Sequence, residues 1–203
     1  MERTETTNAT NTAPVKIAVF ASGTGTNAAK LIDYFSDSPV ARVALVVCNK
    51  PGAGVLNIAE KAGIPSLLIE KEAFFRGDAY LSKLRETGIG FLVLAGFLWK
   101  IPQALIDAFP RRIVNIHPAL LPKFGGKGMY GQYVHEAVLQ AGERETGITV
   151  HYVDEHYDSG DIIFQTACPV VEGDTPETIA QRIHQLEHVH YPRVVEEVIK
   201  NSP

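Results

Sequence analysis

Arg111-Arg112-Ile113-Val114-Asn115-Ile116-His117-Pro118-Ala119-Leu120-Leu121-Pro122 predicts the end of a buried strand that carries two polar side chains. The strand is indicated by Ile113, Val114 and Ile116, and Pro118 ends it because proline has no N–H for the ladder. Side chains alternate along a strand, so Asn115 and His117 are expected on one face, at the edge where open α/β sheets bind ligands. Alone, an Asn-x-His triplet is more often structural, so its meaning depends on the rest of the chain.

Strand and helix patterns alternate before this stretch. Strands are expected at 15–21, 41–48, 65–69 and 89–95, and helices at 28–35, 55–62, 78–86 and 102–109. This order predicts an α/β fold with a mostly parallel, twisted sheet flanked by helices and with strand 89–95 near its centre. Residues 147–153 and 161–168 flank an acidic loop and predict an antiparallel hairpin near the C-terminal part.

The remaining segments complete the predicted organisation. Residues 1–13 are polar and without periodicity, so we expect them to be disordered, with 14–203 forming a single domain. Residues 74–76 are expected in a loop, and the glycine-rich segment 125–131 is expected to be a mobile loop beside the site, followed by a helix at 132–141. A final helix is expected to start at Asp174 or Thr175, with Pro176 in its first turn.

Composition excludes several function classes. The chain is 45% hydrophobic and 21% charged, with a net charge of −4, which argues against binding nucleic acid by general phosphate neutralisation. It has no apolar run of about 18 residues that could span a membrane, and residues 1–13 lack the apolar core of a signal peptide. Cys48 and Cys168 lie in apolar runs and are read as buried thiols of a reducing compartment. A cytoplasmic protein is therefore expected.

A glycine loop, Ser22-Gly23-Thr24-Gly25-Thr26-Asn27, joins the first strand to the first helix. Its glycines let the backbone approach an oxyanion, and the free amides at the helix start favour phosphate. The alternatives are a plain tight turn or a dinucleotide site, because Gly23-x-Gly25-x-x-Ala28 meets the loose dinucleotide fingerprint. That fingerprint expects an acidic residue after the second strand, where this chain has Asn49-Lys50-Pro51-Gly52. A phosphate site without a dinucleotide is favoured.

Two other segments permit both a structural and a functional interpretation. The loop 96–102 carries large apolar side chains that either pack under a helix or form a wall for a flat aromatic ligand. His184 and His188 stand four apart on the predicted final helix, a spacing that can bind a metal. No carboxylate of a catalytic metal motif accompanies them, so no metal is predicted.

The chain resembles the folate-dependent formyltransferases over about residues 15 to 192. The resemblance rests on the motif 115–122, on Gly147-Ile148-Thr149-Val150-His151 and on Asp154-Glu155-His156-Tyr157-Asp158-Ser159-Gly160. It implies a Rossmann-like formyltransferase fold. Within the family, the loop 22–27 and the single-domain length are similar to the members that formylate 5′-phosphoribosylglycinamide, because the methionyl-tRNA and hydrolytic members carry an additional domain.

The resemblance also implies a reaction and its participants. The acceptor amine attacks the formyl carbon of 10-formyltetrahydrofolate, a co-substrate, and the tetrahedral intermediate loses tetrahydrofolate. Asn115 would donate to the developing oxyanion, His117 would donate to that oxygen or transfer a proton to the leaving nitrogen, and Asp158 would hold His117 and order water. The small-molecule partners are then phosphoribosylglycinamide and formyl-folate, with no nucleic acid, membrane or metal, and with either a monomer or a homodimer.

The same resemblance implies the binding residues. Gly25, Thr26 and Asn27 would hold the ribose phosphate, and Glu187 would contact the glycinamide or ribose. The folate would be bound by the loop of Leu98, Trp99, Lys100 and Ile101, and Arg76 would meet its glutamate tail. Many relatives have methionine and arginine where this chain has Trp99 and Lys100, so contacts at the folate rim differ.

Two other functions use the same residues. In a phosphosugar- or nucleotide-binding module without chemistry, Asn115, His117 and Asp158 would be structural. In a 10-formyltetrahydrofolate hydrolase, water would replace the amine as the nucleophile. Loss of turnover without loss of substrate binding in His117→Ala excludes the module, and formate release without an acceptor identifies the hydrolase.

Overall fold

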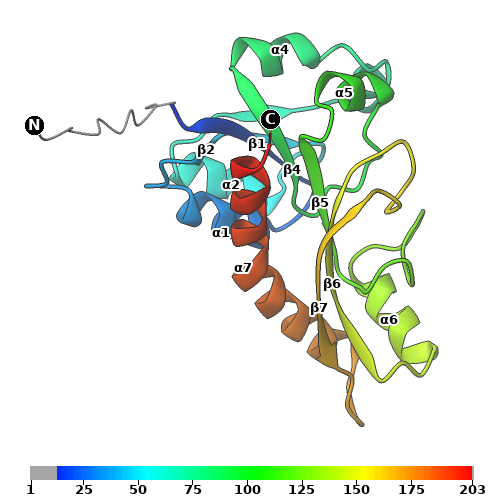
Figure 1. Ribbon diagram of the computed structural model, residues 1–203. Coiled ribbons are helices and arrows are strands. Elements are labelled where there is room, and N and C mark those ends of the chain that lie inside the picture. The colour runs from blue at the N-terminus through cyan, green and yellow to red at the C-terminus, as the bar shows by residue number, and fades with distance from the viewer. Residues whose placement is uncertain (1–12, 203) are drawn as a thin grey trace, which may run out of the picture.

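The computed structural model describes residues 13–202 and has a seven-stranded sheet at its centre (Figure 1). The strand order is β3-β2-β1-β4-β5-β6-β7. The strands are β1 (Val15–Ala21), β2 (Ala41–Cys48), β3 (Ser66–Leu68), β4 (Ile89–Leu94), β5 (Ile113–His117), β6 (Glu145–Tyr152) and β7 (Ile162–Pro169). The predicted disorder of residues 1–13 falls, except for the last of them, outside the described residues.

The pairing of the strands confirms the predicted α/β sheet. β1 to β5 pair in parallel, and β4 lies in the middle of the order, as its apolar sequence predicts. β6 and β7 form the expected antiparallel hairpin. The antiparallel part begins one strand earlier than the hairpin, because β6 also pairs antiparallel with β5. That pairing brings the polar side chains of β5 and β6 side by side.

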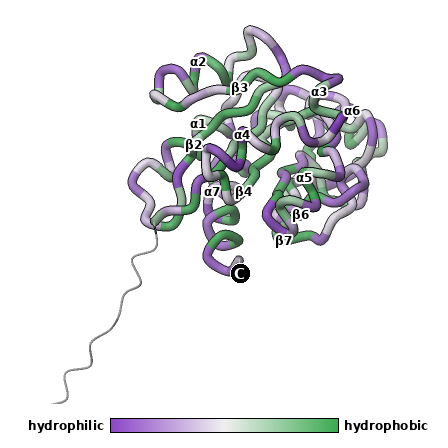
Figure 2. The backbone as a smooth tube through the Cα atoms, turned by 90° about the horizontal axis from the view of Figure 1, so that it is seen from above, coloured by the Kyte–Doolittle hydropathy of each residue, from purple (hydrophilic) through white to green (hydrophobic). Residues whose placement is uncertain are grey.

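Helices cover both faces of the sheet because successive strand residues point to opposite sides. One core cluster packs α1 (Thr26–Tyr34), α2 (Gly54–Lys61), α6 (Gln132–Gln140) and α7 (Pro176–Lys200) on one face. The other packs α3 (Lys71–Phe75), α4 (Leu81–Glu86) and α5 (Gln103–Ala108) on the opposite face. Figure 2 shows hydrophobic stretches along the strands between these layers. Both cysteines are buried and free, as expected.

The predicted loop at residues 74–76 is wrong. Phe74 and Phe75 belong to the short helix α3, and Arg76 caps it. Phe74 is 2% exposed, and its ring lies 5.7 Å from those of Phe97 and Trp99. Five residues are too few to form a helix by local propensity, so the burial of this aromatic side chain stabilises the turn.

Helix α7 positions side chains near the sheet edge. It starts as predicted, with Thr175 accepting a hydrogen bond from the backbone of Thr178 and Pro176 in its first turn. Midway along it, the buried Tyr191 hydroxyl donates to the carbonyl of Leu94 at 2.8 Å, at the end of β4. Among residues 13–202, no helix combines the length and apolar character needed to cross a bilayer.

Candidate active site

A cavity of about 660 Å³ lies at the carboxyl ends of β1, β4 and β5. This is where an open parallel sheet places its ligands. Four segments form most of its lining, namely 22–27, 95–98, 115–118 and 126–131. Side chains from elsewhere complete it, namely Lys50, His135, Tyr157, Asp158, His184 and Glu187. The cavity therefore joins the glycine loop to the Asn-x-His stretch.

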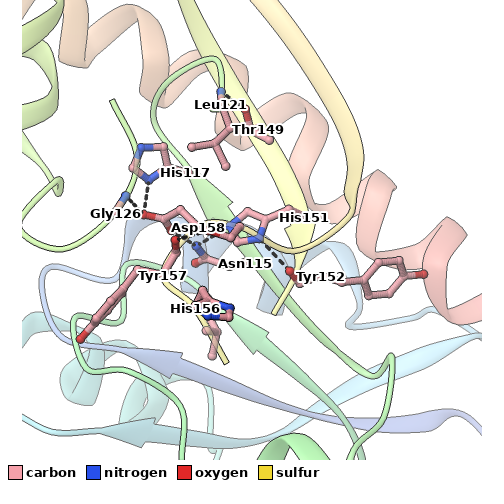
Figure 3. A network of polar contacts seen from close by, with 12 residues as sticks. Asn115, His117, Leu121, Gly126, Thr149, His151, Tyr152, His156, Tyr157 and Asp158 are labelled. Carbon is pink, nitrogen blue, oxygen red and sulfur yellow. Dashed lines mark hydrogen bonds and ion pairs between the residues drawn. The ribbon is translucent and has the colours of Figure 1, made fainter. Parts of the chain in front are cut away.

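His117 and Asp158 line one end of the cavity, and Figure 3 shows their side chains beside each other. His117 Nδ1 lies 3.6 Å from Asp158 Oδ2, and the His117 side chain is 4% exposed. His117 Nε2 lies 2.8 Å from the Phe124 carbonyl oxygen, which can only accept, so Nε2 carries a proton. The Gly126 amide donates to Asp158 Oδ2 at 2.9 Å. Nδ1 is thus the nitrogen that faces the carboxylate and can exchange a proton.

Asn115 lies beside this pair and also contacts His151. Its Nδ2 is 3.1 Å from His151 Nε2 and 3.4 Å from Asp158 Oδ1. His151 Nδ1 donates to the Tyr152 carbonyl at 2.8 Å, so in the neutral ring Nε2 accepts from Asn115. Our site prediction omitted His151. The signal that identifies it is strand register, because His151 is the cross-strand partner of Asn115.

Burial and charge act in opposite directions on these groups. Burial lowers the pKa of His117 below its usual value, although the Asp158 carboxylate opposes that shift. Burial alone would raise the pKa of Asp158, but interactions of its carboxylate with the imidazoles of His151 and His117 and with the Gly126 amide outweigh burial and hold that pKa below its usual value. Asp158 is therefore ionised at neutral pH beside a largely neutral His117.

Two contacts of His117 are held by left-handed backbone. Phe124 has φ of 57° and Asp158 has φ of 52°, a region that residues with a Cβ rarely adopt. Such conformations cost on the order of 1–3 kcal/mol each and persist only where the surrounding structure determines them. The fold thus fixes both contact partners of His117 before any ligand binds.

Thr149 and Gln165 support the segment after His117 from behind. Thr149 lies opposite His117 in the β5–β6 pair and opposite Gln165 in the β6–β7 pair. Its hydroxyl donates to the Ala119 carbonyl at 2.6 Å and accepts from the Leu121 amide at 3.0 Å. Gln165 Nε2 donates to Thr149 Oγ1 at 2.8 Å and to the Leu121 carbonyl at 2.9 Å. No local sequence signal singles out Gln165, because its role depends on three aligned strands.

The glycine loop forms the other end of the cavity. Gly25 is the N-cap of α1 with φ of 83°, and a Cβ there would lie 2.8 Å from Val55. No side chain caps the helix, so the amides of its first turn at Thr26 and Asn27 remain available to a ligand. Glycine at this position is therefore required both by the backbone conformation and by the close packing of α2.

Glu187 reaches the cavity from α7 beside the glycine loop. Its side chain accepts a hydrogen bond from Asn27 Nδ2 at 2.8 Å, and the residue is 6% exposed. Burial raises the pKa of Glu187 to about 7, although the Asn27 hydrogen bond opposes this shift. Glu187 can therefore act as either a donor or an acceptor near neutral pH.

The residues predicted to bind folate separate into two groups. Leu98 is 48% exposed and lines the cavity. The other residues do not line the cavity. Trp99 packs against the phenylalanines of α3, and Ile101 is buried in the core. Lys100 and Arg76 are exposed outside the cavity lining. The packing interpretation of loop 96–102 thus fits Trp99 and Ile101, whereas Leu98 keeps the ligand-wall interpretation.

Histidines line the wall between the two ends. His135 and His184 both face the cavity, and burial first, then repulsion from His184 and His117, lowers the pKa of His135 to about 4. The rings of His184 and His188 are nearly parallel, with centroids 6.2 Å apart. Within residues 13–202, no group of three or more His, Cys, Asp or Glu side chains is arranged to hold a metal.

Residues 15–195 match the protein family described as Formyl transferase. The chain belongs to the formyl transferase family. It is 46% identical over 186 residues to the chloroplastic phosphoribosylglycinamide formyltransferase of Arabidopsis thaliana, covering 89% of this chain and 64% of that protein. It is 41% identical to the phosphoribosylglycinamide formyltransferase of Bacillus subtilis (strain 168), covering 91% of this chain and 94% of that protein.

Solved structures agree with this membership. The glycinamide ribonucleotide transformylase 1 of Geobacillus kaustophilus superposes with a TM-score of 0.83 at 40% identity, over 92% of this chain and 99% of that one. The chain spans 64% and 60% of the two plant chloroplast relatives that it matches. The resemblance to formyl transferases inferred from the motifs is thereby confirmed, and the roles of individual residues stay predictions.

Proposed function

We propose that the chain transfers the formyl group of 10-formyltetrahydrofolate to the amine of 5′-phosphoribosylglycinamide, a step of purine biosynthesis. The observation that carries this proposal is a single cavity with Asn115, His117 and Asp158 at one end and a glycine-capped helix start at the other. The relatives named above as phosphoribosylglycinamide formyltransferases support the choice of acceptor.

The phosphate of the acceptor binds at the start of α1. The backbone amides of Gly25, Thr26 and Asn27 and the positive end of the helix dipole provide for an anion there. Glu187, hydrogen-bonded to Asn27, contacts the ribose or glycinamide part. The amine then extends along the cavity towards His117, and Leu98 contacts the folate.

At the reacting end, the amine nitrogen forms a bond to the formyl carbon and the formyl oxygen gains negative charge. Asn115 Nδ2 gives up its long 3.4 Å contact with Asp158 and donates to that oxygen, an interaction worth on the order of 3 kcal/mol in comparable sites. His117, largely neutral at rest, takes a proton at Nδ1 from the attacking amine and returns it to the folate nitrogen as the carbon–nitrogen bond breaks. Asp158 stabilises the transient imidazolium.

The test is the formation of tetrahydrofolate, followed by absorbance, with and without phosphoribosylglycinamide. If the chain transfers the formyl group, tetrahydrofolate should form only when the acceptor is present, together with an equal amount of the formylated acceptor. Formate release without the acceptor would instead identify a hydrolase. No turnover, with phosphate compounds still bound, would leave a binding module.

A further inference from the structure

The cavity contains two lysines that the proposed mechanism does not use. Lys50 follows β2 and Lys127 lies in the glycine-rich loop, and both line the cavity. Neither forms an ion pair in the part of the chain that the structure describes, residues 13–202. The cavity is also lined by Asp158 and Glu187, whose carboxylates repel a phosphate dianion, so a nearby positive charge would favour its binding.

Lys50 lies in the turn between β2 and α2, and its backbone contacts neighbouring residues of that turn. Its amide and carbonyl both contact Cys48 Sγ, at 3.4 and 3.3 Å, and its carbonyl accepts from the Ala53 amide at 3.3 Å. The next residues pack directly on the loop, because the Val55 amide donates to the Gly23 carbonyl at 3.2 Å. The two loops are therefore joined, and the exposed Lys50 lines the same cavity as residues 22–27.

We infer that the Lys50 ammonium pairs with the phosphate bound at Gly25–Asn27 and makes the acceptor site selective for a terminal phosphate monoester. A lysine binds phosphate as a point charge, which complements backbone amides that carry only partial charge. Dinucleotide sites place a carboxylate after the second strand for a ribose hydroxyl, whereas this chain places a cation there. The inference rests on the proposed function and adds a specificity-determining residue to it.

Lys50→Met tests this inference with two acceptors, phosphoribosylglycinamide and its dephosphorylated analogue. We expect the KM of the phosphorylated acceptor to rise about tenfold, with kcat within about twofold and the KM of the analogue unchanged. Salt should weaken acceptor binding less in the variant, because one charge pair is gone. Lys50→Arg should restore most of the affinity, and Lys61→Met, at the exposed end of α2, is the matched control for loss of one charge.

Inorganic phosphate separates failure of this inference from failure of the proposed function. If the wild-type protein shows no transfer, calorimetric titration with phosphate still compares wild type and Lys50→Met, and about tenfold weaker binding in the variant would support the lysine alone. Equal KM values for wild type and variant, or equal phosphate affinities, would overturn it. A KM increase in Lys127→Met but not in Lys50→Met would also overturn it and assign the charge to the glycine-rich loop.

Discussion

The two ends of the cavity are built in different ways. At the reacting end, side chains from β5, from β6 and from the loop after β6 converge, and Asn115, His117, His151 and Asp158 hold one another. At the end where we propose that phosphate binds, called the phosphate end below, one continuous loop, 22–27, presents backbone amides, and its shape depends on a glycine. The reacting end depends on chemical groups and the phosphate end on backbone geometry. Removal of a functional group should therefore impair the reacting end most, whereas an added methyl group should impair the phosphate end most.

His117→Ala should give the largest effect. Removing the group that we propose transfers the proton should lower kcat by about 10³-fold or more, because within residues 13–202 no other imidazole contacts both Phe124 and Asp158. Acceptor binding, which depends on the other end, should change little. Steady-state kinetics combined with calorimetric acceptor titration measure the two quantities separately. Equal losses in kcat and in affinity would show that the two ends are not independent.

Asp158→Asn should lower kcat by about 10²-fold while keeping the shape of the loop. The carboxylate raises the pKa of His117 against the effect of burial, so its removal should lower that pKa further. A lower pKa means that the imidazolium formed during transfer is less stable in the variant than in wild type, so turnover is slower. Titration of the His117 ring protons by NMR in wild type and variant measures the shift. An unchanged or higher pKa would contradict the assigned contact.

Gly25→Ala should disturb the phosphate end alone. An alanine at position 25 would have to adopt the left-handed backbone of Gly25, and its Cβ would lie 2.8 Å from Val55. Together these two effects should lower the free energy of unfolding by about 3 kcal/mol. The acceptor KM should rise at least tenfold as the amides move. Gly23→Ala is the matched control, because its Cβ meets nothing within 4 Å and its φ is not positive. Urea denaturation and acceptor kinetics measure both effects, and equal behaviour of the two variants would refute the steric argument.

The same difference explains what could be predicted from the sequence. Gly25 and the helix start are encoded in adjacent residues, so the glycine loop and the helix that follows it can be predicted from local pattern. The strands follow from apolar runs, and Asn115 and His117 share a face because of simple alternation. The alternating order of strands and helices likewise predicts the parallel sheet. These features need no information about tertiary contacts.

Other features depend on contacts between distant segments. His151 and Gln165 enter the site through strand register, which the sequence of each strand alone does not define. Helix α3 forms because Phe74 is buried against Phe97 and Trp99, so tertiary packing overrides local propensity. The same packing holds the half-buried Trp99 and the buried Ile101 away from the cavity, so of the four loop residues predicted to bind folate only Leu98 lines it.

Glu187 is the exception at the phosphate end, because it is a buried ionisable side chain hydrogen-bonded to the loop through Asn27. Burial raises its pKa to about 7, above the usual 4.5 that it has in the unfolded chain. Between these two values the folded protein binds more protons than the unfolded chain, so stability falls as pH rises and levels off above about pH 7. The stabilisation that comes from the raised pKa of Glu187 is fully present only below the pKa that this residue has in the unfolded chain.

Glu187→Gln should remove this pH dependence, since the neutral amide keeps an oxygen for Asn27 Nδ2 and carries no charge to bury. Between about pH 5.5 and 8, wild type should lose about 2 kcal/mol of unfolding free energy relative to the variant. Urea unfolding at each pH measures the difference, and Glu197→Gln, an exposed change on the same helix, is the control. Parallel stability curves for wild type and Glu187→Gln would mean that Glu187 is solvated in solution, and the phosphate end would then depend on backbone geometry alone.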